Sequence, residues 1–214
     1  MVEETETSWC RTKVTKIKLK TYREPSALDR IRAVVAFFHG MCSHTNEGSH
    51  IAKELAKNGY EVVGFDQRGF GKSEGRRGFI RSFETLLVDS EMFLAEVRKV
   101  YPDKQIFLHG ISLGGLTCAA IAIRKPEEYA GCILMAPAIK SFWGKWAHRA
   151  AGVLSTLFPT TQISKRGQGS KRGSKNPNVS ELRRSDKYRY MGDPYITTLH
   201  SVLDGSNAYR GRTS

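Results

Sequence analysis

Short, nearly continuous apolar runs recur along the chain and restrict its fold more than any other feature. They occupy residues 33–38, 61–65, 105–108 and 132–135. Runs of this length are typical of strands that are covered on both faces. Stretches with helical patterning separate them, at residues 47–58, 83–100 and 113–124. Strands that alternate with helices predict a doubly wound, mainly parallel α/β sheet, with ligands at the carboxyl ends of the strands.

The stretch at residues 83–100 has the clearest helical period. Its apolar residues fall on one side, and Ser82 stands in the N-cap position with Glu84 in the first turn. We expect the apolar side to pack on the sheet. Residues 14–20 alternate apolar and polar side chains instead, which predicts a half-exposed outer strand.

The composition is that of a globular protein. Of 214 residues, 40% are hydrophobic and 26% are charged, which fits one domain with a sizeable core. Residues 1–8 lack the basic and apolar regions of a secretory signal, and no apolar run approaches the roughly 20 residues that span a bilayer. The cysteines are scattered without a C-x-x-C pair. We therefore expect a reducing, cytoplasmic location. We expect neither a metal nor a cofactor.

More than half of the net charge of +13 lies in one segment. Between Lys165 and Arg189 there are nine basic residues against Glu181 and Asp186. No aromatic platform or zinc-ligand spacing accompanies them, so we do not expect nucleic-acid binding. The segment is rich in Gly and Ser, which favours a solvated insertion; peripheral contact with anionic lipid is the alternative.

From residue 138 the alternation of strands and helices stops. An apolar helix face follows, formed by Trp143, Trp146, Ala147, Ala150, Val153, Leu154 and Leu157, and a short helix is expected near residues 196–203. We interpret residues 138–195 as an inserted helical cap, residues 1–137 as the core, and residues 196–214 as the start of an incomplete C-terminal part. For the tryptophans, core packing is the simplest interpretation and lining an apolar substrate channel is the alternative.

A G-x-S-x-G motif, Gly110-Ile111-Ser112-Leu113-Gly114, lies between an apolar strand and a helix. This context predicts a nucleophile elbow, in which a strained turn presents Ser112. Gly110 and Gly114 are required there because side chains at these positions would collide with neighbouring backbone. A plain glycine-rich turn is the alternative.

Acyl transfer at such a serine needs N–H groups that point at the oxyanion. The elbow supplies the N–H of Leu113, at the positive end of its helix. The loop His39-Gly40-Met41 follows the strand at residues 33–38, and a flexible Gly40 would let the Met41 N–H turn inward. We expect His39 to be structural rather than catalytic, because it precedes the serine.

Four segments together resemble the monoacylglycerol lipase and lysophospholipase branch of the α/β-hydrolases, the serine aminopeptidase-type family. They are Phe37-Phe38-His39-Gly40, the run from Tyr60 to Gly75 that contains Asp66-Gln67-Arg68-Gly69-Phe70-Gly71-Lys72-Ser73, the run from Gly78 to Phe83, and the elbow. The resemblance covers residues 13–137 well and the cap loosely. It implies an α/β-hydrolase fold, a nucleophile at Ser112, oxyanion N–H groups at Met41 and Leu113, and a small lipid ester as substrate.

The triad acid and histidine of this fold follow later strands, and no further β-rich run follows residue 135. We therefore expect the last two strands of the fold to be missing. Asp186, Asp193 and His200 have the required order, but they lie in polar or ordinary helical surroundings, and His148 precedes every such acid. Without its neighbours, the strand at residues 132–135 would form an apolar edge open to a protein partner.

Two functions follow as hypotheses. The first is a serine hydrolase that cleaves lipid esters, monoacylglycerol or lysophospholipid, through an acyl-serine intermediate; an esterase for small substrates is a variant of it. The second is a non-catalytic hydrolase-fold subunit that lacks the acid and histidine and acts by binding a partner.

Overall fold

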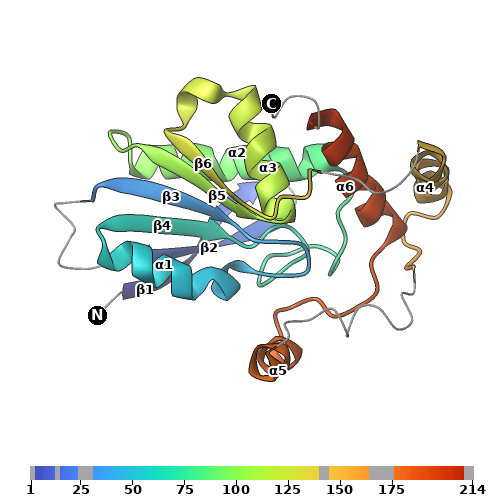
Figure 1. The fold of residues 1–214 in the computed structure, drawn as a ribbon, viewed down its shortest axis with the longest axis horizontal. Helices are drawn as coiled ribbons and strands as arrows, with labels where there is room; N and C mark the ends of the chain where they lie inside the picture. The colour runs from blue at the N-terminus through green and yellow to red at the C-terminus, as the bar shows by residue number, and fades with distance from the viewer. Residues whose placement is uncertain (1–2, 13–14, 24–30, 140–144, 164–175, 210–214) are drawn as a thin grey trace.

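A computed structural model describes residues 3–12, 15–23, 31–139, 145–163 and 176–209. It contains one six-stranded sheet with the order β1-β2-β4-β3-β5-β6 (Figure 1). The strands are β1 (Glu3–Thr12), β2 (Thr15–Arg23), β3 (Ala33–Phe38), β4 (Tyr60–Phe65), β5 (Ile106–Ile111) and β6 (Gly131–Met135). The pairs β4–β3, β3–β5 and β5–β6 are parallel, while β1–β2 and β2–β4 are antiparallel. The prediction of a mainly parallel α/β sheet is therefore confirmed.

Helices alternate with the inner strands, as the sequence predicts. They are α1 (Ser49–Lys57), α2 (Phe83–Val100), α3 (Leu113–Arg124), α4 (Lys145–Leu157), α5 (Pro177–Ser185) and α6 (Ile196–Tyr209), with short 3₁₀ turns at Thr45–Gly48 and Pro126–Glu128. The predicted N-cap of α2 is confirmed, because the Ser82 side chain accepts a hydrogen bond from the Thr85 N–H. None of the described helices is long and apolar enough to cross a membrane.

Side chains of β3 alternate between the two faces of the sheet. Val34, Ala36 and Phe38 belong to the larger hydrophobic cluster, which includes residues of α2 and α3 and Tyr209 of α6. Val35 and Phe37 belong to a smaller cluster with Ala52 of α1. Both faces are therefore covered, α1 on one and α2, α3 and α6 on the other (Figure 1). This two-sided burial explains the continuous apolar runs of the inner strands.

Strand β6 forms one edge of the sheet. Its side chains Ile133, Leu134 and Met135 are 48%, 37% and 42% exposed. Within the described residues no strand pairs with its outer side. An apolar edge at residues 132–135 is thus present, as the sequence predicts.

The expectation that Trp146 packs in a core was wrong. This residue is 82% exposed, and Val153 and Leu157 on the same helix are 61% and 65% exposed. Of the apolar residues of α4, Ala151 alone is among the buried residues. The helical period was read correctly, but the apolar side of α4 faces solvent rather than a core. Trp143 lies outside the described residues.

Two further elements differ from the prediction. Strand β1 was not predicted, and it pairs with β2 along almost its whole length, with a register shift between Trp9 and Arg11. Helix α6 extends to Tyr209, beyond the short helix expected at residues 196–203. It does so because its last turn packs on the core, where Tyr209 is 6% exposed. Residues 164–175, which include five of the nine basic residues between Lys165 and Arg189, lie outside the described residues.

Candidate active site

Ser112 occupies a sharp turn between β5 and α3. Its backbone has φ 54° and ψ −111°, a conformation that residues other than glycine rarely adopt and that stores strain. Three hydrogen bonds fix the turn: the Ser112 N–H donates to Met135 O at 2.9 Å, and the N–H groups of Leu116 and Ala138 donate to Ser112 O at 3.0 Å each. The serine is exposed and its side chain makes no capping hydrogen bond. The turn therefore presents a hydroxyl at the carboxyl edge of the parallel strands.

The two glycines that flank Ser112 are required by close backbone approaches. A Cβ atom at Gly110 would lie 2.3 Å from the carbonyl oxygen of Gly114. A Cβ atom at Gly114 would lie 2.1 Å from the carbonyl oxygen of Phe38. Neither neighbour is a flexible side chain, so no larger residue fits without moving the backbone.

The loop after β3 runs beside Ser112. A Cβ atom added to Gly40 would lie 3.5 Å from the Cβ of Ser112, so the backbone of this loop borders the same space as the serine. Met41 is half-buried and packs on the main hydrophobic cluster. On the other side of Ser112, Leu113 begins helix α3. Of the predicted oxyanion donors, Leu113 thus follows Ser112 directly and Met41 follows Gly40, which borders the serine.

His39 holds this loop in place. Its Nδ1 lies 2.8 Å from Gly40 O, and its Nε2 accepts a hydrogen bond from the Gln67 N–H at 2.9 Å. The ring must therefore be neutral, with its proton on Nδ1. Burial lowers the pKa of His39 and favours the same neutral form. The Gln67 side-chain amide also donates to His39 O at 2.7 Å.

Asp66 is a second organiser of the site that the sequence analysis did not single out. One carboxylate oxygen accepts hydrogen bonds from Thr45 N and Thr45 Oγ1, and the other from Lys72 N, all at 2.8 Å. A Cβ atom at Gly71, where φ is +54°, would lie 2.1 Å from that second oxygen. The Asp-x-Arg-Gly-x-Gly run therefore forms a turn around the Asp66 carboxylate. The hydrogen bonds of this carboxylate join the loop after β4 to the loop after β3.

None of the described hydrogen bonds joins a histidine to the Ser112 hydroxyl. His200 and His148 both bond to Asp204, at 3.3 and 2.8 Å. Of the acids considered for a rebuilt triad, Asp186 lies 2.6 Å from Nε2 of His44. The structure thus does not bring Asp186, Asp193 and His200 together at Ser112. The pairings His148–Asp204 and His44–Asp186 were not predicted, because residues that are far apart in sequence form them.

Comparison with known proteins identifies the family of this chain. Residues 29–213 match the family model described as serine aminopeptidase, S33. The chain belongs to this family of α/β-hydrolases. The match includes the elbow, the loop after β3 and the Asp66 turn, so the family resemblance inferred from the motifs is confirmed.

Monoglyceride lipases are among the relatives of this chain. The enzyme of Rattus norvegicus is 30% identical over 118 residues, which are 55% of this chain and 38% of the relative. The monoacylglycerol lipase of Mycolicibacterium smegmatis is 29% identical over 113 residues, 53% of this chain and 40% of the relative. The chain therefore spans about two fifths of these lipases.

Solved structures agree on the fold. The monoacylglycerol lipase of Paleococcus ferrophilus has a TM-score of 0.75 and 25% identity, with 90% of this chain and 70% of that chain covered. A soluble variant of the Saccharomyces cerevisiae monoglyceride lipase has a TM-score of 0.79 at 21% identity, with 98% and 70% covered. The fold of this chain thus has counterparts in known lipases.

Proposed function

We propose that this protein is a serine hydrolase of lipid monoesters, monoacylglycerol or lysophospholipid, with Ser112 as nucleophile. The strained, exposed turn at Ser112 is the observation that carries the proposal, because proteins retain such strain chiefly at functional sites. Family membership and the lipase relatives support the same chemistry.

The reaction takes two steps. Ser112 Oγ attacks the ester carbonyl, a C–O bond forms to the serine, and the bond to the glycerol or glycerophosphate oxygen breaks. Water then attacks the acyl-serine and releases the fatty acid. The N–H groups of Leu113 and Met41 are the proposed donors to the negatively charged oxygen of each tetrahedral intermediate. One such donor contributes roughly 10²–10³ in turnover.

The attacking hydroxyl must lose its proton, and the described residues offer no histidine that is bonded to it. Loss of the histidine in a serine protease lowers turnover about 10⁶-fold, and what remains comes from the oxyanion hole and binding. We therefore expect these 214 residues by themselves to acylate slowly. Reaction with a fluorophosphonate also requires Ser112 to lose its proton, but its reactive fluoride leaving group needs no proton from an acid, so it is the more sensitive assay.

The proposal extends to peripheral contact with a lipid surface through α4. Trp146, Val153, Leu154 and Leu157 are exposed on this helix, and so is the basic residue Arg149. Apolar side chains beside basic ones are typical of helices that lie in a membrane interface. Such contact would bring the site to its substrate.

A non-catalytic, partner-binding role is the second candidate. It is favoured by the pairing of His44, His148 and His200 with carboxylates other than a triad acid. The exposed apolar strand β6 would be the docking surface for a protein partner.

A labelling experiment separates the two. The purified chain is incubated with a fluorophosphonate probe, and the modified residue is identified by mass spectrometry. We expect labelling at Ser112, abolished in Ser112→Ala and retained in Ser185→Ala, which removes an exposed serine on α5. A folded protein without label at Ser112 would remove the hydrolase proposal and leave the binding role.

Substrate class is tested with the same protein. A long-chain monoacylglycerol should be hydrolysed with a higher kcat/KM than a glycerol monoacetate, because each buried methylene contributes ~0.8 kcal/mol. Equal values for the two esters would indicate an esterase for small substrates.

A further inference from the structure

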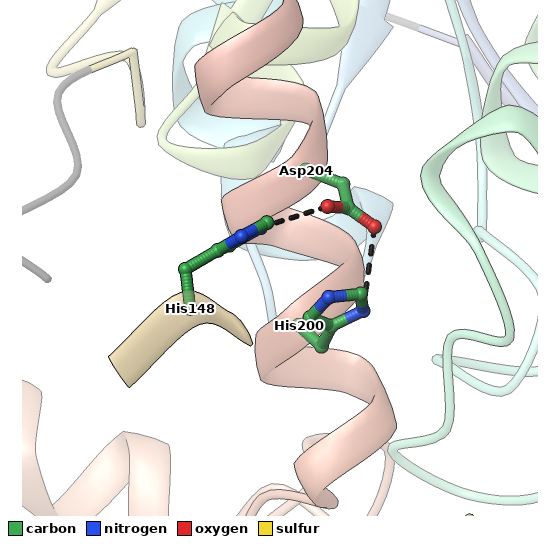
Figure 2. Close-up of side chains that lie close together, drawn as sticks. All are labelled: His148, His200 and Asp204. Atoms are coloured by element: carbon green, nitrogen blue, oxygen red, sulfur yellow. Dashed lines mark hydrogen bonds and ion pairs between the residues drawn. The ribbon is translucent and has the colours of Figure 1, made fainter. Parts of the chain in front are cut away.

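His148 of α4 meets His200 and Asp204 of α6 (Figure 2). His148 Nε2 lies 2.8 Å from one carboxylate oxygen of Asp204. His200 Nδ1 lies 3.3 Å from the other. The two imidazole rings stack, with centroids 4.9 Å apart and planes inclined by 29°. One nitrogen from each ring and the carboxylate therefore converge on the same small volume.

We propose that these three side chains form a binding site for a divalent transition-metal ion of the Zn²⁺ class. One ligand atom from each residue lies within 4.8 Å of the other two. Zn²⁺ binds imidazole nitrogen and carboxylate oxygen at about 2.0–2.2 Å, which separates tetrahedral donor atoms by about 3.3 Å. The separations from Asp204 to His148 and to His200, 2.8 and 3.3 Å, are already close to that value. Two imidazoles with one carboxylate are also a donor set that selects transition metals over Mg²⁺ or Ca²⁺.

The backbone of α4 is shaped to admit the His200 ring. A Cβ atom at Gly152, one turn after His148, would lie 2.9 Å from His200 Nε2. The absence of a side chain at Gly152 lets the ring lie directly against α4 and face His148. His200 and Asp204 are one turn apart on α6, so a single helix holds two of the three ligands in register.

The electrostatics of the cluster suit a cation. Within the described part of the chain, no lysine or arginine pairs with Asp204, and the guanidinium of Arg149 lies over the Trp146 ring instead. The side chains are 25%, 21% and 49% exposed for His148, His200 and Asp204, which leaves an entry path and room for water as the fourth ligand.

A second group of similar composition does not meet these conditions. His44, Glu47 and Asp186 also lie close together. There, however, the guanidinium of Arg189 already pairs with Glu47, so a cation would be repelled.

An ion bound by His148, His200 and Asp204 would join the cap helix α4 to α6, which packs on the core. It would thereby restrain the movement of α4.

A zinc titration tests the site. Tag-free protein of the full 214 residues is titrated with zinc sulfate against a chromogenic chelator, with excess Mg²⁺ present. We expect one equivalent of zinc to bind, and His148→Ala or His200→Ala to weaken binding by at least about tenfold. The matched control His50→Ala removes an exposed histidine on α1 and should bind as the wild type does. No binding at micromolar zinc, or equal affinity in all four proteins, would overturn the proposal.

Two measurements on the wild-type protein keep the test valid if a variant misfolds. X-ray absorption of the zinc-loaded protein should show nitrogen and oxygen ligands with imidazole scattering; a sulfur shell at about 2.3 Å would place the metal on a cysteine and refute the site. Zinc should also slow hydrogen exchange of the α4 amides relative to those of α5. Unchanged exchange in α4 of the loaded protein would contradict the proposed link between α4 and α6.

Discussion

The Cα of Gly114 lies so close to Phe38 that a Cβ atom there would be 2.1 Å from the Phe38 carbonyl oxygen. The first turn of α3 is thereby packed against the end of β3, and Ser112 is held between them. Backbone contacts of this kind cannot relax by a change of rotamer. The position of Ser112 thus depends on the absence of a side chain at Gly114.

Gly114→Ala should therefore lower the free energy of unfolding by about 2–4 kcal/mol, because the start of α3 must move away from β3. Urea unfolding followed by circular dichroism measures this loss. Gly40→Ala is the matched control, since its Cβ would meet Ile111 O and Ser112 Cβ at 3.4 and 3.5 Å, ordinary contact distances. A Gly114→Ala midpoint equal to that of Gly40→Ala would contradict the tight approach.

Asp66→Ala should be destabilising by about 2–4 kcal/mol, since it removes the acceptors of three hydrogen bonds and leaves the buried Thr45 N–H without its partner. The loss should appear both in urea unfolding and as slower fluorophosphonate labelling, because Asp66 joins the loops on either side of the site. Asp103→Ala, at an exposed turn, should change stability by less than about 0.5 kcal/mol. Equal effects of the two substitutions would refute the organising role of Asp66.

The elements that the sequence predicted best are those whose signals are local. Helix α2 has the predicted bounds because an amphipathic period and the Ser82 cap both mark its start. The turn at Ser112 was predicted for a similar reason, since glycines at fixed spacing encode the close approaches. Strand β1 has no such local signal: it is defined by backbone pairing with β2, and its polar sequence does not reveal that pairing.

Contacts between distant segments account for the rest. The sequence gives the period of α4 but not what covers its apolar side, so the exposure of Trp146 could not be foreseen. His148 and Asp204 are 56 residues apart, and their pairing depends on how the cap folds back over α6. The same holds for His44 and Asp186, separated by 142 residues.

The pairing of His44 with Asp186 predicts a loss of stability in acid. Burial of Asp186 acts to raise the pKa of its carboxyl, but hydrogen bonds from His44 and from the Tyr188 and Arg189 backbone outweigh it, and the pKa lies below its ordinary 3.8. When folding lowers the pKa of a carboxyl group, the group stabilises the protein fully at any pH above its pKa in the unfolded chain. This stabilisation is lost as the pH falls through the lower pKa that the group has in the folded protein.

The difference in Tm between wild type and Asp186→Asn should thus be constant from pH 7 to about pH 5 and shrink below about pH 4. Thermal unfolding across this range measures it. Asp193→Asn, at an exposed position in the same segment, should follow the wild type throughout. A difference that persists unchanged at pH 2.5 would show that Asp186 acts through packing rather than through its charge.

Trp146 provides the test of lipid contact. Because it is 82% exposed, Trp146→Ser should change the free energy of unfolding by less than about 0.5 kcal/mol. Binding to vesicles that contain phosphatidylserine should weaken by about tenfold, since a large apolar side chain no longer enters the interface. Sedimentation with sucrose-loaded vesicles measures the bound fraction. Val88→Ser removes an exposed apolar side chain from α2, and it should leave vesicle binding unchanged; equal losses in both variants would mean that α4 is not the contacting surface.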